Sequence, residues 1–185
     1  MTAAEQTAPE TIPDGMGIII EPGTIRFERL LPGPIERVWA YLTDSDKRGQ
    51  WLASGEMEPR AGTAFSLHFD NSGLSPVRIP TPERFRRYDT GITTAHQITR
   101  FEPPRLLAIT WGGGTEEPSE VTFELAEEGE GVRLVLTHRR LPDARSMTNV
   151  GAGWHSHLSI LADKLSGRTP PSFWTLFGKL EPVYS

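Results

Sequence analysis

Two histidines in the stretch GAGWHSHLSILADKL, residues 151–165, are the first candidates for chemistry. His155 and His157 stand two residues apart in a segment whose second half predicts a helix. Successive helical residues turn by about 100°, so the two imidazoles point roughly 200° apart and cannot ligate one metal ion. The chain has no cysteine. The remaining histidines fall in separate predicted strands: His68, His96 and His138. We therefore expect no metal site and no cofactor.

Catalytic motifs are equally sparse. The sequence has no G-x-S-x-G elbow and no thiol. Its pairs of adjacent glutamates fall at predicted hairpin ends, where acidic runs usually form a solvated face. A run of three glycines precedes acidic residues and a strand, whereas a phosphate cradle needs a helix N-terminus or a positive nest. We assign no catalytic residue from the sequence. An enzyme would have to use His96, His138 or His157 as a general base.

A cavity is the third possibility, because one face of the predicted helix is strongly apolar. Trp154 shares this face with Leu158, Leu161 and Leu165, and His157 lies about 60° from Trp154 at its edge. This pattern is typical of a helix that covers a sheet. An ordinary core face with a histidine at its rim would show the same pattern.

Two glycines in the first half of this helix favour the cavity. Gly151 and Gly153 each cost roughly 1 kcal/mol relative to alanine inside a helix. They leave two positions without side chains above the predicted sheet. That space is either filled by an aromatic side chain from the sheet or left as a pocket.

The predicted strands supply matching walls. In GVRLVLTHRR, Leu134, Leu136 and His138 share one face. His138 is either a hydrogen-bonded core histidine or a group that orients a ligand. An apolar surface with a few polar groups is typical of a small-molecule site. The predicted ligand-binding residues are Trp51, Phe65, Phe69, Phe85, His96, Trp111, His138, Trp154, His157, Leu158 and Leu161.

The order of the predicted elements indicates an α+β protein. A strand near residues 24–31 precedes two short helices between 34 and 52. Alternating patterns then predict antiparallel strands over 55–59, 63–70, 93–102, 105–111, 119–127 and 131–141, with a long loop at 71–92. The long helix runs from about 146 to 166, with Gly167 as its C′ residue. Sequential strands favour a curved meander that wraps around this helix.

The 185 residues suit one domain with two tails. Residues 1–15 are polar and predict a disordered arm, 16–168 form the domain, and the aromatic-rich tail 169–185 is expected to pack on it. A net charge of −5 argues against a nucleic-acid binder. No apolar run approaches the ~18 residues that span a bilayer, and the N-terminus lacks the features of a secretory signal. We expect a cytoplasmic protein, monomeric or homodimeric, without a membrane partner.

Four phrases carry a family resemblance. They are RVWAYLTDSDKRGQWLASGEMEPRAGTAFSLHF, HQITRFEPPRLLAITW, SEVTFELAEEGEGVRLVLTHRRLPD and GWHSHLSILADKLSGR. They resemble the START-like (SRPBCC) superfamily with its helix-grip fold, in the bacterial branch related to the C-terminal domain of the activator of the heat-shock-protein-ninety ATPase. The resemblance covers roughly residues 24–168. It implies a curved antiparallel sheet around a long C-terminal helix, in a superfamily that binds lipids, hormones and polyketides and includes cyclases and hydrolases.

These observations lead to one expected function and two alternatives. We expect a small, largely apolar ligand in a cavity between the sheet and the C-terminal helix. The first alternative is a cyclase- or hydrolase-type enzyme on the same fold, which an open pocket with convergent polar groups would favour. The second is a co-chaperone-like interaction module, which a closed and filled core would favour.

Overall fold

The computed structural model of the protein describes residues 15–112 and 117–185. Apart from Gly15, the predicted N-terminal arm lies outside the described residues. The strands are β1 (Ile18–Glu21), β2 (Thr24–Pro32), β3 (Ala64–Phe69), β4 (Ile92–Glu102), β5 (Leu106–Trp111), β6 (Ser119–Glu128) and β7 (Gly131–Arg139). The helices are α1 (Ile35–Thr43), α2 (Ser45–Arg48), α3 (Ala144–Leu165) and α4 (Phe173–Leu180), with short 3-10 turns at Asn71–Gly73, Glu83–Tyr88 and Glu181–Val183.

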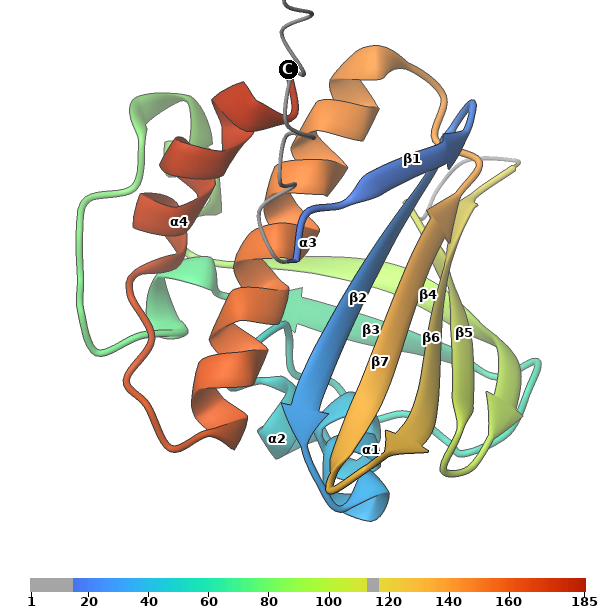
Figure 1. Ribbon diagram of the computed structural model, residues 1–185. Coiled ribbons are helices and arrows are strands. Elements are labelled where there is room, and N and C mark those ends of the chain that lie inside the picture. Colours follow the sequence, from blue (N-terminus) through green and yellow to red (C-terminus); the bar gives the residue numbers. More distant parts are fainter. Residues whose placement is uncertain (1–14, 113–116) are drawn as a thin grey trace, which may run out of the picture.

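The sheet is antiparallel and curved, and α3 lies across its concave side (Figure 1). Its strand order is β1-β2-β7-β6-β5-β4-β3, so β3 to β7 form a meander and β2 closes onto β7. Helices α1 and α2 cover one end of the sheet, between β2 and β3. The predicted helix-grip architecture is confirmed.

The ends of α3 follow from local capping. The Asp143 side chain accepts a hydrogen bond from the Ser146 backbone N–H at 2.7 Å, so the helix begins two residues before the predicted Ser146. At the other end Gly167 has a φ of 69°, as predicted for a C′ glycine. The N–H groups of Gly167 and Arg168 bond to the carbonyls of Lys164 and Asp163, which satisfies two free carbonyls of the last turn.

One predicted strand is absent. Residues 55–59 form no strand, and only the bridge between Ser54 and His68 joins this segment to β3. The cause lies at Gly55, whose φ of 142° is outside the range of a regular strand. Its carbonyl accepts a hydrogen bond from the buried Arg48 guanidinium, so the segment turns toward α2.

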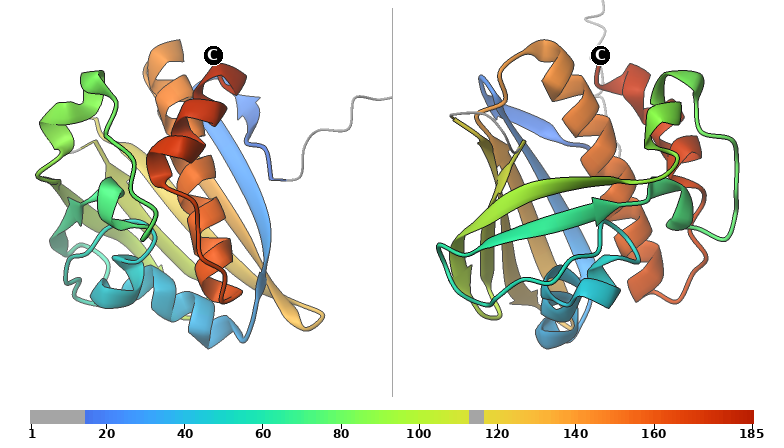
Figure 2. Two further views of the ribbon diagram at one scale, coloured as in Figure 1. Left: turned by 90° about the vertical axis from the view of Figure 1, so that its left-hand side faces the viewer. Right: turned by 180° about the vertical axis from the view of Figure 1, so that it is seen from behind.

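The C-terminal tail forms a further layer. Helix α4 runs beside α3, and the segment between β3 and β4 lies along its outer side (Figure 2). Phe173, Trp174 and Phe177 of α4 are buried, with exposed fractions of 3%, 6% and 6%. Helix α3 is therefore covered by the sheet on one side and by α4 on another. Of the helices described, none combines the length and apolar character that crossing a bilayer requires.

Candidate functional site: an aromatic cavity

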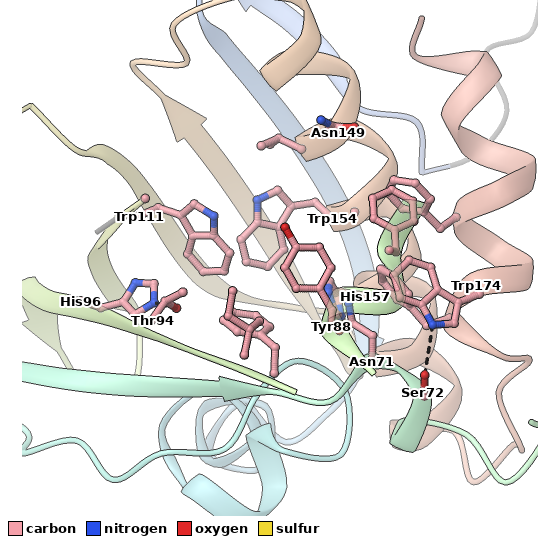
Figure 3. Close-up of a pocket in the computed structure, with 18 residues that line it drawn as sticks. Asn71, Ser72, Tyr88, Thr94, His96, Trp111, Asn149, Trp154, His157 and Trp174 are labelled. Atoms are coloured by element: carbon pink, nitrogen blue, oxygen red, sulfur yellow. Dashed lines mark hydrogen bonds between the residues drawn. The ribbon is translucent and has the colours of Figure 1, made fainter. Parts of the chain in front are cut away.

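A cavity of about 400 Å³ lies between β4, β5, α3, α4 and the segment that joins β3 to β4 (Figure 3). Aromatic side chains dominate its lining: Phe69, Phe85, Tyr88, Trp111, Trp154, Phe173, Trp174 and Phe177. Small and polar residues complete it: Asn71, Ser72, Ile92, Thr94, His96, Gly112, Asn149, Val150, Gly153 and His157. Among the described residues, none with a charged side chain belongs to this lining.

The two glycines of α3 have different surroundings. A Cβ atom on Gly153 would meet no atom within 4 Å, and this residue lines the cavity. A Cβ on Gly151 would lie 2.6 Å from the Tyr184 ring. A pocket at Gly151 is therefore wrong. An aromatic ring fills that space, but it is Tyr184 from the C-terminal tail and not an aromatic from the sheet.

Trp154 and His138 belong to a chain of hydrogen bonds beneath the cavity. The Trp154 indole Nε1–H donates to His138 Nδ1 at 3.0 Å, which leaves the proton of a neutral His138 on Nε2. That Nε2–H reaches Ser119 Oγ at 2.8 Å, and the Ser119 hydroxyl donates to the Trp111 carbonyl at 3.1 Å. Burial lowers the pKa of His138 to about 3. His138 is thus a neutral core histidine with both ring nitrogens occupied, and it does not line the cavity.

His96 is on the wall but is also fully engaged. Its Nδ1–H donates to the Thr110 carbonyl at 2.7 Å, and its Nε2 accepts from the Thr94 hydroxyl at 2.6 Å. Burial lowers its pKa, so the neutral form is favoured. Neither ring nitrogen is left to bind a ligand or to remove a proton.

His157 differs from both. Its Nδ1–H donates to the Trp51 carbonyl at 2.8 Å, and its ring packs on Phe173 with centroids 4.7 Å apart. Burial lowers its pKa to about 4. At neutral pH the ring therefore carries its proton on Nδ1 and a lone pair on Nε2. Within the described part of the chain Nε2 has no hydrogen-bond partner, although His157 lines the cavity.

His155 points to the other side of α3. Its Nδ1 lies 2.9 Å from the Tyr184 hydroxyl oxygen, whereas His157 faces Trp51. The predicted divergence of these two imidazoles is confirmed. Within residues 15–112 and 117–185, no group of three or more His, Cys, Asp or Glu side chains is placed to hold a metal ion.

The structure brings only part of the predicted residue set to the cavity. The residues that line it are Phe69, Phe85, His96, Trp111, Trp154 and His157. The residues that do not are Trp51, Phe65, His138, Leu158 and Leu161, all of them buried in the core. They lie one layer deeper: Trp154 bonds to His138, the Phe65 ring lies 5.6 Å from the His96 ring, and the Trp51 ring lies 6.5 Å from Phe123.

Helix α4 contributes a cavity wall that was not predicted from the sequence. Phe173, Trp174 and Phe177 stand at i, i+1 and i+4 after two prolines, a spacing that indicates a short amphipathic helix. Trp174 stacks on Phe85 with centroids 5.0 Å apart, and its indole N–H donates to Ser72 Oγ at 3.1 Å (Figure 3). No local signal marked Asn71 or Ser72, which reach the cavity only through the path of the loop.

Comparisons with known proteins agree with this architecture. Residues 32–166 match the family model described as "Activator of Hsp90 ATPase homolog 1-like protein". A protein of Bordetella parapertussis with a solution NMR structure is 54% identical, with 93% of this chain and 90% of that chain covered and a TM-score of 0.79. A comparison with curated proteins finds no match.

More distant structures share the fold. CalU16 from Micromonospora echinospora is 24% identical over 87% of this chain and 85% of its own, with a TM-score of 0.63. DynU16, a protein in the dynemicin biosynthetic locus, is 18% identical over 80% of this chain and 49% of its own, with a TM-score of 0.62.

Proposed function

Because the chain belongs to the family of activator of Hsp90 ATPase homolog 1-like proteins and encloses an aromatic cavity, we propose that it binds a small, largely apolar molecule there. The observation that carries this proposal is the open space at Gly153, in front of Trp154 and under α4. Protein cores are normally filled to crystal-like density. A volume of about 400 Å³ also falls in the range of roughly 300–1,000 Å³ that is typical of small-molecule sites.

The geometry supports binding better than either alternative. An interaction module was expected to have a closed and filled core, and the cavity is open. A cyclase or hydrolase would need a base. Of the three candidate histidines, only His157 has a ring nitrogen without a hydrogen-bond partner among residues 15–112 and 117–185. With a pKa of about 4, that nitrogen is a weak base at neutral pH, although it accepts hydrogen bonds well.

The same proposal includes the setting in which the protein works. A net charge of −5 supports a partner other than nucleic acid, and we propose a cytoplasmic binder of small molecules. DynU16, which shares this fold, is a protein in the dynemicin biosynthetic locus, and this supports a role for the fold in binding small molecules.

Filling the cavity tests the proposal. N-phenyl-1-naphthylamine, a neutral fluorescent probe, is expected to bind the wild-type protein and to gain fluorescence. Gly153→Leu places a side chain into the open space, so this variant should lose probe binding and retain its melting temperature. Gly178→Leu is the matched control, because Gly178 also lies on a helix in open space and does not line the cavity.

A filled core would give the opposite result. Gly153→Leu would then overpack the region and destabilise the protein by roughly 1–3 kcal/mol, and the wild-type protein would bind no probe. Either observation contradicts the proposed function. Native mass spectrometry of protein purified from its own host, which looks for a small molecule that stays bound, would identify the natural ligand.

A further inference from the structure

Several polar groups of the cavity wall are satisfied by the protein itself. Thr94 donates to His96, His96 donates to Thr110, Trp154 donates to His138 and Trp174 donates to Ser72. The Tyr88 hydroxyl and the Asn149 carboxamide also line the cavity, but each can donate or accept and so does not discriminate between ligands. A group with a single fixed role determines which ligand chemistry fits.

One hydrogen-bond acceptor on the cavity wall remains free at the α4 end. His157 is 7% exposed, and its Nε2 lone pair has no partner among the described residues. Its ring packs on Phe173 of α4, so this nitrogen belongs to the wall that α4 completes. The Asn71 side-chain oxygen Oδ1 also lacks a partner there, but it is fully buried and is closed to a ligand in the cavity. A ligand that supplies an O–H or N–H group would therefore pair with His157 Nε2.

The tautomer of His157 makes this preference specific. Its Nδ1–H is held by the Trp51 carbonyl, so the ring cannot rotate its proton to Nε2 without losing that bond. Protonation at Nε2 would place a charge in an apolar site, and burial already lowers the pKa of His157 to about 4. Near neutral pH His157 therefore presents only an acceptor to the cavity. The Trp111 indole N–H at the opposite end has no partner among the described residues, and it donates equally to the oxygen of a hydroxyl group or of an ether.

The cavity also selects against charge. The described lining of the cavity contains no arginine. Arginines line a neighbouring depression that shares Phe85, Tyr88 and Asn149 with the cavity; there Arg84 pairs with Glu181, and the side chains of Arg87 and Arg145 are exposed. An ion placed between the aromatic walls would lose its hydration without gaining a counter-charge, which is costly. A flat aromatic body instead fits the indole and phenyl faces.

We infer that the ligand is an uncharged aromatic molecule with at least one O–H or N–H donor, which His157 Nε2 accepts at the α4 end of the cavity. This inference rests on the proposed function and adds the ligand class and the residue that determines specificity.

A set of naphthalenes of similar size tests it at pH 7.5. 2-Naphthol carries a donor, 2-methoxynaphthalene has only an acceptor, and 2-naphthoate is an anion. Their affinities follow from displacement of N-phenyl-1-naphthylamine. 2-Naphthol is expected to bind about tenfold more tightly than 2-methoxynaphthalene, the ratio that one well-placed hydrogen bond supplies, and 2-naphthoate should bind least.

The variants assign the preference to residues. His157→Phe keeps the aromatic contact with Phe173 and removes the acceptor, so 2-naphthol should fall to the affinity of 2-methoxynaphthalene while the latter is nearly unchanged. The affinity ratio of the wild-type protein tests the preference directly, should His157→Phe fail to fold. His155→Phe is the matched control, because His155 is on the same helix but faces Tyr184, and it should keep the wild-type ratio.

The outcomes separate this inference from the proposed function. Equal affinity of the wild-type protein for 2-naphthol and 2-methoxynaphthalene would overturn the inference and leave cavity binding intact. Preferred binding of 2-naphthoate would also overturn it, because the carboxylate would then contact the exposed arginines of the neighbouring depression. If no naphthalene and no probe binds, the proposed function itself fails.

Discussion

Trp154 has two roles at the residue scale. Its ring forms a wall of the cavity, 4.9 Å from the Trp111 ring, and its indole N–H satisfies His138 in the layer below. The site and the core therefore share one side chain. A substitution at this position should change stability and binding by different mechanisms, which can be measured separately.

Trp154→Phe removes the indole donor and part of the ring. We expect a loss of roughly 1–3 kcal/mol in the free energy of unfolding, because His138 Nδ1 is then buried without a partner. Denaturant unfolding measures this loss. A matched variant, Trp111→Phe, removes an indole whose N–H has no partner among the described residues, so it should cost less. Equal losses in the two variants would contradict the role assigned to the Trp154 hydrogen bond.

Glycine shows what sequence can and cannot predict at this scale. The sequence shows that both helical glycines lack side chains on this helix, and the spacing of its apolar residues correctly predicts a face that packs on the sheet. Only Gly153 opens onto the cavity, since Tyr184 covers Gly151. That difference depends on the path of a tail more than thirty residues away, which no local pattern contains.

At the scale of elements, the capping and periodicity rules predicted most of the fold. Gly167 ends α3 as expected, and Asp44 caps α2 through the Lys47 N–H. The apolar stripe on α3 predicted its contact with the sheet. The deeper placement of His138 and Phe65 could not be predicted in the same way, because alternation along a strand gives the face of a residue but not the layer that covers it.

The segment between β3 and β4 and helix α4 together form the outer wall of the cavity. They meet through the Phe85–Trp174 stack, the Ser72–Trp174 hydrogen bond and the Arg84–Glu181 ion pair. The 3-10 turn Glu83–Tyr88 contains no buried residue. This wall is thus attached by side chains at a few points, whereas the sheet is joined by continuous backbone ladders.

Hydrogen exchange should reveal this difference between elements. We expect the amides of residues 83–91 to exchange faster than those of β6 and β7, since few buried contacts protect them. Bound 2-naphthol should slow exchange in residues 83–91 and in α4, because it contacts both. Mass spectrometry after timed labelling measures the rates. Slowing confined to the distal hairpin of β6 and β7 would place the ligand elsewhere.

At the scale of the whole molecule, the buried histidines make folding sensitive to pH. Burial lowers the pKa to about 3 for His138 and to about 4 for His155 and His157. In the unfolded chain each of these groups titrates near its ordinary value of ~6.5. Between about pH 6.5 and 4 the unfolded state therefore binds more protons than the folded state, so stability must fall as the pH is lowered through this window.

The size of the effect follows from the two histidines that are almost completely buried. From pH 7 to pH 5, His138 and His157 should each cost roughly 2 kcal/mol of unfolding free energy, while the partly exposed His155 adds less. Urea unfolding at the two pH values measures the change. His157→Gln retains a polar side chain that does not titrate, so the difference in unfolding free energy between pH 7 and pH 5 should shrink by roughly 2 kcal/mol in this variant.

The carboxylates of Asp44, Glu128 and Asp143 do not interfere with this comparison. Hydrogen bonds lower their pKa values, so they lose their contribution to stability only at still lower pH. An unfolding free energy that is the same at pH 5 and pH 7 would mean that these histidines are not held neutral in the folded protein, and the lone pair on His157 would lose its basis.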